Sequence, residues 1–129
     1  MALVTTKKMF EKAFEGHYAI GAFNINNMEI IQGVVNAAKA QNSAVILQVS
    51  KSALKYAGPL YLKAMVDAAV AETGLDIALH LDHGPDIETV KECIAVGFTS
   101  VMFDGSHYDY EENVAKTKEV VDFAHSHGV

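Results

Sequence analysis

One short run of the sequence combines residue types that suit metal binding and proton transfer. It reads His-Leu-Asp-His-Gly at positions 80–84 and ends an apolar segment that starts at Ile77. An imidazole at the end of a strand can bind zinc through one ring nitrogen, and a neighbouring carboxylate can move protons. We therefore interpret His83 as a metal ligand with Asp82 beside it. His80 shares a strand face with Asp82, and we expect it to pack in the wall of the fold, hydrogen-bonded and inert.

Polar residues also end three other apolar segments. Asn24, Ser50 and Asp104 follow the segments 18–23, 44–49 and 99–103. Asn24 and Ser50 could donate hydrogen bonds to a phosphate, although capping the helix that follows is the better local explanation. Asp104 could hold a cation or orient a histidine, or it could simply start a turn with Gly105. Four polar ends together still predict a binding site, because ligands of parallel α/β folds bind where the strands end.

The elements that would hold these residues alternate along the chain. Strands are expected at 18–23, 44–49, 77–81 and 99–103. Helices are expected from Thr5 or Thr6 to residue 15 and at 28–41, 60–72, 85–95 and 110–126. Four strand–helix units in succession predict a parallel sheet with helical crossovers, in one domain. A doubly wound open sheet and a barrel both satisfy this order.

Composition excludes several classes of function. The net charge is −6 without a basic run, so the chain has no field that would attract nucleic acid or an anionic membrane. No apolar stretch approaches the roughly 18 residues of a membrane span. The single cysteine, Cys93, fits a reducing cytoplasmic compartment. The segment after the first expected strand, 24–27, contains no glycine, which argues against a dinucleotide-binding turn.

Over its whole length the sequence resembles the class II, zinc-dependent fructose-bisphosphate aldolases. Seven stretches carry the resemblance in the order and spacing of that family. They are Gly-Ala-Phe-Asn-Ile-Asn-Asn (21–27), Ala-Val-Ile-Leu-Gln-Val-Ser (44–50), Lys-Tyr-Ala-Gly (55–58), His-Leu-Asp-His-Gly (80–84), Gly-Phe-Thr-Ser-Val-Met-Phe-Asp-Gly-Ser (97–106), Glu-Glu-Asn (111–113) and Ala-His-Ser-His-Gly-Val (124–129).

The resemblance implies an α/β fold of the (β/α)₈ TIM-barrel type. Residues 1–129 would supply the first four β/α units and an N-terminal helix, which is the N-terminal half of a single aldolase domain. A complete barrel takes about 250 residues, so the chain is expected to be truncated or split before a fifth strand.

The resemblance also implies roles for individual residues. Asp82 matches the catalytic acid/base and His83 the first of three histidine ligands to the catalytic zinc. Asp104 matches a carboxylate that holds a second cation in some members. Asn24 and Ser50 match substrate-binding residues, with Ser50 near a phosphate. The reaction would be the reversible cleavage of fructose 1,6-bisphosphate to dihydroxyacetone phosphate and glyceraldehyde 3-phosphate in glycolysis, with zinc as a Lewis acid.

The other two zinc histidines, a later carboxylate and the phosphate loops of the family belong to the second half of the barrel. We therefore expect the isolated chain to bind zinc weakly and to be inactive, and we expect it to pair with the remaining half and to form homo-oligomers. An aldolase for tagatose bisphosphate or another ketose bisphosphate is equally compatible. A non-catalytic half-barrel remains an alternative. A metal-dependent hydrolase is disfavoured because His80 and His83 are not two residues apart.

Overall fold

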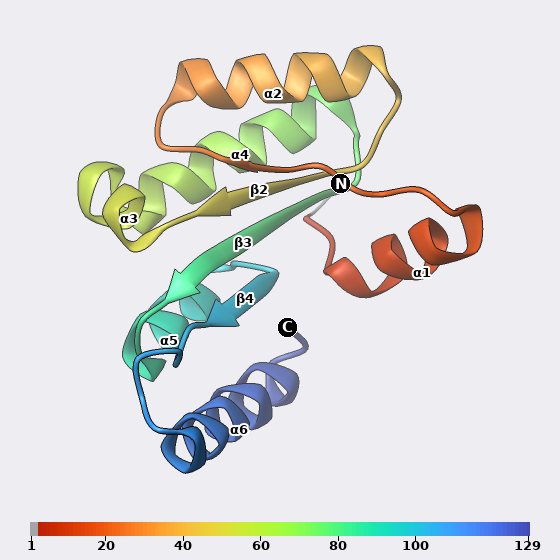
Figure 1. The fold of residues 1–129 in the computed structure, drawn as a ribbon. Helices are drawn as coiled ribbons and strands as arrows, with labels where there is room; N and C mark the ends of the chain where they lie inside the picture. Colours follow the sequence, from red (N-terminus) through yellow and green to blue (C-terminus); the bar gives the residue numbers. More distant parts are fainter. Residues whose placement is uncertain (1–2) are drawn as a thin grey trace.

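The computed structural model describes residues 3–129, and a parallel sheet of four strands forms its centre (Figure 1). The strands are β1 (Ala22–Asn24), β2 (Val45–Val49), β3 (Ile77–Gly84) and β4 (Ser100–Phe103), and they lie in the order β1-β2-β3-β4. Each strand is therefore hydrogen-bonded to its neighbour in the sequence. The expectation of a parallel α/β sheet with successive crossovers is confirmed.

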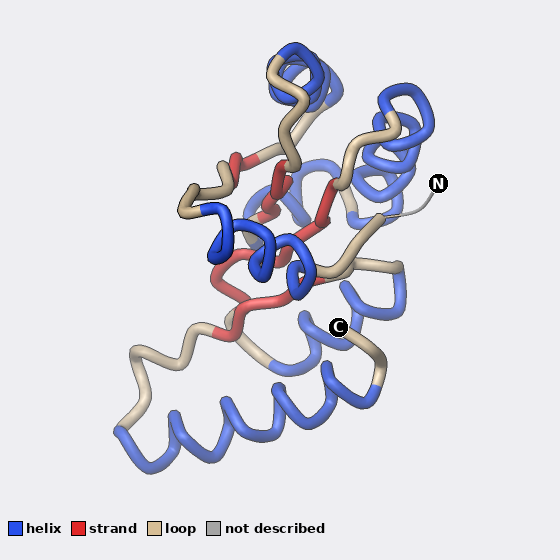
Figure 2. Tube along the Cα trace, turned by 90° about the vertical axis from the view of Figure 1, so that its right-hand side faces the viewer, coloured by secondary structure: helices blue, strands red, loops and turns tan. Residues whose placement is uncertain are grey.

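Six helices surround this sheet. They are α1 (Thr6–Gly16), α2 (Met28–Ala40), α3 (Lys51–Ala57), α4 (Pro59–Thr73), α5 (Ile87–Val96) and α6 (Tyr110–Ser126). Helices α2, α4, α5 and α6 contact one another in that order and follow the outer side of the curved sheet, whereas α1 stands apart where the strands begin (Figures 1 and 2). No helix within residues 3–129 has the length and apolar character needed to cross a membrane.

The face of the sheet beneath the helices forms the main core. Leu47, Val49, Leu79 and Leu81 are completely buried on this face and belong to one apolar cluster with residues of the surrounding helices. Cys93 of α5 is buried in the same cluster. Apolar residues at alternate positions of β2 and β3 thus fix which side of each strand faces outward.

The opposite, inner face changes character along the strands. At the start of the strands, Ile46 and Ala78 are buried against Met9 of α1. Two residues further along each strand, the inner positions are polar. They are occupied by Gln48 of β2 and His80 of β3, which pair in register. The inner face therefore becomes polar toward the carboxyl ends of the strands, where the sequence predicted a site.

Four local expectations need correction. Strand β1 begins at Ala22 and not at residue 18, because its partner β2 begins only at Val45. Strand β3 runs on to Gly84, because an irregularity after Leu81 lets pairing with β4 resume. Helix α5 begins at Ile87 and not at Pro85, since Asp86 is its N-cap. The seven-residue helix α3 was not predicted at all.

Gly84 should be intolerant of a side chain because β3 and β4 approach each other closely there. A Cβ atom at this position would lie 2.7 Å from the backbone oxygen of Met102 and 2.9 Å from Cδ2 of Leu81. We expect Gly84→Ala to lower the free energy of unfolding by about 1–3 kcal/mol, measured by urea denaturation.

Gly33 is the matched control on the exposed side of α2, where an added Cβ meets nothing within 4 Å. Gly33→Ala should raise stability by about 0.5–1 kcal/mol, because glycine in a helix is less favourable than alanine. Equal effects of the two substitutions would contradict the close approach of β3 and β4 at Gly84.

Candidate functional site

Asp82 is held in place by a side chain from the neighbouring strand. The Nε2 group of Gln48 donates to Oδ2 of Asp82 at 3.1 Å and to Oδ1 of Asn24 at 2.9 Å. The Asp82 side chain is only 17% exposed. Two of the residues predicted from the sequence, Asn24 and Asp82, are therefore brought together through one amide.

Sequence reasoning did not select Gln48 as a site residue. The one signal that could have found it is a polar residue inside the otherwise apolar run 44–49, at a position of the same parity as buried Ile46. A polar residue on the inner face of a parallel strand needs partners in the interior. Gln48 finds them in Asn24 and Asp82.

His83 and Asp104 form the second pair of the site. Nδ1 of His83 lies 2.7 Å from Oδ2 of Asp104, so the imidazole donates from this nitrogen to the carboxylate. Nε2 is the other ring nitrogen, and it lies 3.9 Å from Oδ1 of Asp82. The carboxylate thereby leaves Nε2 of a neutral ring as the nitrogen with a free lone pair, which is what a metal ligand requires.

The same contacts shift the pKa values of this pair. The hydrogen bond to Asp104, together with the charge of Asp82, raises the pKa of His83. Hydrogen bonds from the hydroxyl and backbone amide of Ser106, and from His83, hold the pKa of Asp104 well below its usual range. The turn expected after Asp104 is present, because Oδ1 of Asp104 accepts from the Ser106 amide at 3.0 Å. Asp104 thus begins a turn and also orients the histidine.

The backbone at His83 is strained. Its φ angle is +51°, a left-handed conformation that residues with a Cβ rarely adopt. The residue lies in the irregular stretch of β3 between Leu81 and Gly84. Strain of this kind concentrates at functional sites, where surrounding contacts hold an unfavourable conformation in place.

His80 lies deeper in the sheet than His83. Its Nδ1 is 2.7 Å from the hydroxyl oxygen of Ser100 on β4. Burial lowers the pKa of His80, and the nearby charge of Asp82 opposes this only in part. The neutral, hydrogen-bonded ring agrees with the expectation that His80 packs in the wall.

Ser50 serves as a helix cap and also lines a polar cavity. Its hydroxyl accepts from the backbone amide of Ala53 at the start of α3, and Ser52 Oγ lies 2.9 Å away. A cavity of about 410 Å³ opens beside it, with Asn24 and Tyr56 on other sides. The capping explanation is therefore correct for Ser50, and the position of the cavity is also compatible with ligand binding. For Asn24 it is wrong, because Asn27 caps α2 and Oδ1 of Asn24 accepts from Gln48 instead.

These residues fit only part of a zinc site. Within residues 3–129, no group of three or more histidine, cysteine, aspartate or glutamate side chains is arranged to hold a metal ion. His83 offers one nitrogen of the right kind, with Asp82 and Asp104 as neighbouring carboxylates. A catalytic zinc ion needs about three protein ligands, so these residues alone do not complete such a site.

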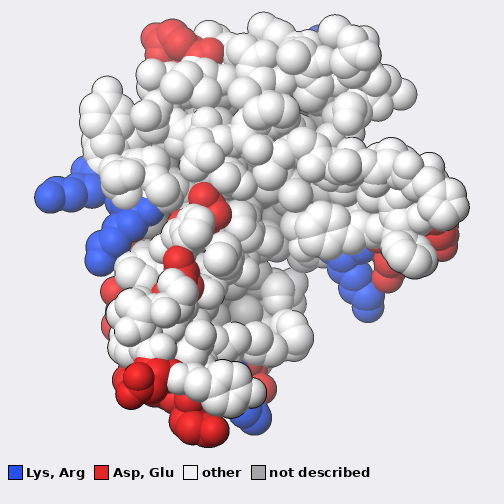
Figure 3. All heavy atoms as spheres, viewed as in Figure 1, with Lys and Arg blue, Asp and Glu red and all other residues white. Residues whose placement is uncertain are grey.

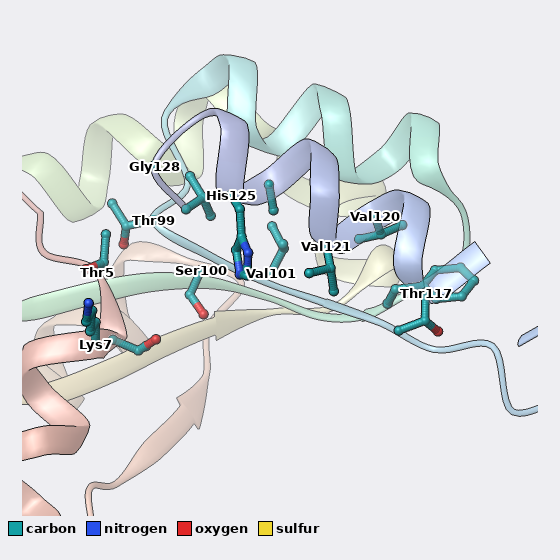
Figure 4. Close-up of a pocket in the computed structure, with 14 residues that line it drawn as sticks. Thr5, Lys7, Thr99, Ser100, Val101, Thr117, Val120, Val121, His125 and Gly128 are labelled. Atoms are coloured by element: carbon teal, nitrogen blue, oxygen red, sulfur yellow. The ribbon is translucent and has the colours of Figure 1, made fainter. Parts of the chain in front are cut away.

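A further cavity lies away from these residues. It measures about 730 Å³ and opens between β4, α6 and the segment that leads into α1 (Figure 4). Its walls include Val101 of β4 and Val120 and Val121 of α6.

Acidic side chains gather over the first turn of α6, which contains Glu111 and Glu112, at the end where the strands finish (Figure 3).

Comparison with known proteins adds to this geometry. A family model described as fructose-bisphosphate aldolase class-II matches residues 4–129. The chain belongs to this family. The resemblance predicted from the sequence is thereby confirmed.

Individual aldolases align with the entire chain. The sequence is 48% identical to the fructose-bisphosphate aldolase of Giardia intestinalis over 130 residues, covering 100% of this chain and 40% of that protein. It is 46% identical to the fructose-bisphosphate aldolase of Staphylococcus aureus over 132 residues, covering 100% and 46%. The YdjI aldolase of Escherichia coli K12 has a similar fold, with a TM-score of 0.92, 31% identity and coverage of 99% and 49%. The chain therefore spans about half the length of these aldolases.

The His83–Asp104 contact should be visible in a titration of the metal-free aldolase chain. We expect the C2 proton of His83 to titrate by NMR above the ordinary pKa of 6.5, and Asp104→Asn to move the titration midpoint back toward that value.

The same pair makes the stability of the fold depend on pH. The contact of His83 stabilises the fold below pH 6.5, and this effect is lost as the pH rises through the raised pKa of His83. Asp104 stabilises it above pH 3.8 and loses this effect in acid. Both contribute fully between these values, and an unchanged midpoint in Asp104→Asn would contradict the contact.

The strain at His83 can be measured apart from its imidazole. His83→Ala and His83→Gly both remove the ring and its bond to Asp104, but only glycine adopts the left-handed backbone readily. We expect the glycine variant to be more stable than the alanine variant by about 1 kcal/mol in urea denaturation. An alanine variant of equal or greater stability would show that the backbone is not strained.

Proposed function

We propose that this chain is part of a zinc-dependent aldolase that cleaves fructose 1,6-bisphosphate reversibly to dihydroxyacetone phosphate and glyceraldehyde 3-phosphate. The observation that carries the proposal is the arrangement of Asp82 and His83. Nε2 of His83 lies 3.9 Å from Oδ1 of Asp82, while Asp104 occupies the other ring nitrogen. A nitrogen that could bind a metal and an oxygen that could accept a proton are thus adjacent at the carboxyl end of β3.

Asp82 would be the catalytic acid/base. As the carbon–carbon bond breaks, its electron pair stays with the ketone half and the substrate hydroxyl becomes the aldehyde carbonyl. The hydroxyl proton moves to Asp82. The carbon that keeps the electron pair then takes up a proton, which a group of the second half or solvent would supply, to give dihydroxyacetone phosphate, and Asp82 releases its proton to water. Each transfer is reversed in the condensation direction. A positioned general base of this kind contributes about 10²–10⁴-fold to the rate.

His83 would be one ligand of the catalytic zinc ion, and Asp104 would fix the orientation of its ring. Bound zinc supplies a Lewis acid that polarises the ketone of the substrate. Asp104 was also predicted to hold a second cation, and that role remains a proposal. Both carboxylate oxygens of Asp104 already accept hydrogen bonds, Oδ2 from His83 and Oδ1 from the amide of Ser106. A second cation would have to share these oxygens with their present donors.

Asn24 and Ser50 would bind the substrate. Both line the cavity of about 410 Å³ at the carboxyl ends of β1 and β2. The hydroxyl groups of Ser50 and Ser52, 2.9 Å apart, offer donors for a phosphate oxygen. This supports the proposed position of Ser50 near a substrate phosphate.

We further propose that residues 1–129 are the N-terminal half of a single (β/α)₈ barrel domain. The aldolases that align with the chain are about twice as long. The second half would supply the other zinc ligands, and its next strand and helix would fill the cavity beside β4. The isolated chain would then bind zinc weakly and lack activity, and the complete protein would be a homo-oligomer.

The choice between fructose and tagatose bisphosphate is open within this proposal, because the two sugars differ only in the configuration of one hydroxyl group. Comparison of kcat/KM for the two sugars would decide it. The cytoplasmic location stays a prediction from the cysteine content.

The proposed roles can be separated in the full-length protein that contains this segment. Asp82→Asn should retain zinc but lose about 10²–10⁴-fold in kcat for fructose 1,6-bisphosphate. His83→Ala should lose zinc, measured by elemental analysis, together with activity. Asp109→Asn and His17→Ala are the matched controls, because both residues are exposed and lie outside the site. Wild-type turnover in Asp82→Asn would exclude the proposed mechanism.

The same assay on the isolated chain tests the half-barrel proposal. Native mass spectrometry should find no stoichiometric zinc on a single 13.9 kDa chain, and no turnover should be detected. Near-native activity of that chain alone would contradict the proposal.

A further inference from the structure

A row of polar residues crosses the whole sheet at one register. Asn24 of β1 pairs with Gln48 of β2, Gln48 with His80 of β3, and His80 with Ser100 of β4. Side chains of residues paired in register point to the same face of a sheet. This row lies directly after the apolar inner layer of Ile46 and Ala78, and Asp82 follows it toward the carboxyl end.

Gln48 is the residue of this row whose side chain contacts Asp82, the proposed catalytic acid/base. A carboxamide nitrogen carries two hydrogens, and Nε2 of Gln48 uses them on two different strands. One bond goes to Oδ1 of Asn24 and the other to Oδ2 of Asp82, at 2.9 Å and 3.1 Å. Two bonds from one planar group in different directions fix the orientation of that group.

We propose that Gln48 is a positioning residue that makes the two oxygens of Asp82 chemically different. Oδ2 is occupied by the bond from Gln48, so Oδ1 is the oxygen that exchanges the proton with the substrate hydroxyl. This inference rests on the proposed aldolase function, and it adds the atom that performs the transfer. Oδ1 is also the oxygen that lies 3.9 Å from Nε2 of His83.

The need for such a residue follows from the freedom of a carboxylate. The terminal torsion of an aspartate is broad, so an unanchored carboxylate can present either oxygen. A general base acts efficiently only when the accepting atom stays within hydrogen-bond reach of the proton. The hydrogen bond from Gln48 restricts rotation of the Asp82 carboxylate, so Gln48 would act through Asp82 and not through a contact with the substrate.

The same amide sets the position of Asn24 relative to Asp82. Oδ1 of Asn24 accepts from Gln48, so its own amide nitrogen remains the donor that can face a ligand. One side chain on β2 therefore fixes a substrate-binding group on β1 and a proton-transfer group on β3 relative to each other.

Two substitutions in the full-length enzyme remove the donors of Gln48 and preserve its length. Gln48→Met removes both hydrogen bonds, and Gln48→Glu replaces the donors by acceptors and adds a negative charge beside Asp82. Gln32→Met on the exposed side of α2 is the matched control. We expect kcat to fall about 10- to 100-fold in Gln48→Met and at least as far in Gln48→Glu, with a smaller rise in KM because Asn24 is freed as well, and with zinc content unchanged.

A spectroscopic measurement tests the contact independently of turnover. In ¹⁵N NMR spectra, the side-chain amide protons of Gln48 should be protected from exchange with solvent, and Asp82→Asn should shift their resonances and reduce that protection. The side-chain amide of Gln32 should respond to neither change. This measurement uses the wild-type residue at position 48, so it stands even if a Gln48 variant folds poorly.

The outcomes distinguish the two levels of the proposal. An active wild type whose Gln48→Met variant keeps its kcat within about 2-fold, or loses only in KM, would overturn the role of Gln48 and leave the aldolase function intact. Side-chain amide resonances of Gln48 that do not change in Asp82→Asn would also overturn the role of Gln48 and leave the aldolase function intact. A wild type without aldolase turnover would instead overturn the proposed function, and the proton-transfer role would fall with it.

Discussion

The pleat of the four parallel strands decides where each chemical group of this protein lies. Alternate side chains of a strand point to opposite faces, and the helices bury one face of β2 and β3. Every second residue of β2 and β3 must therefore face inward. The inner face is closed by Met9 of α1 where the strands begin, so apolar residues occupy it there. Polar residues have room only near the carboxyl ends, and the candidate site forms at that end.

Electrostatics then shape the site. Two carboxylates, Asp82 and Asp104, flank one imidazole, so even a protonated His83 leaves surplus negative charge. A cation bound there would offset this charge, which is why the arrangement suits a metal better than a bare anionic substrate. The acidic first turn of α6 adds to the negative charge at the same end of the strands. In the barrel proposed above, a bisphosphate would therefore depend on a bound cation, and on donors outside residues 1–129, to overcome that repulsion.

Local signals in the sequence were sufficient for much of the fold. Helix α6 has the predicted bounds, Asn27 caps α2 through its side chain, and Gly74 and Gly97 end their helices in left-handed conformations. Such features depend on a few neighbouring residues and therefore show in the sequence. The extension of β3 depends on its irregular pairing with β4, which arises only when the two strands meet.

The same distinction applies to the site. Asp82, His83, Asp104, Asn24 and Ser50 each follow an apolar segment, and parallel strands end at one edge, which predicted a site there. The individual roles of these residues came from the resemblance to the aldolase family. The partners could not be predicted, because they are set by register between strands far apart in the sequence. Gln48 is the clearest example, since its two hydrogen bonds join residues 24 and 34 positions away. Its role depends on which residue lies opposite, and a single sequence contains no record of that pairing.

Because Cys93 is buried, the rate at which a thiol reagent labels it measures local opening of the fold. The thiol is completely buried between α5 and the sheet, and this burial raises its pKa to about 12, so it is unreactive in the closed state. A thiol reagent can modify it only when a local opening exposes the packed face of α5. Because the chain has one cysteine, the labelling rate counts these openings without any introduced probe. The stability of the wall that supports His83 and Asp104 can thus be followed in residues 1–129 without any substitution.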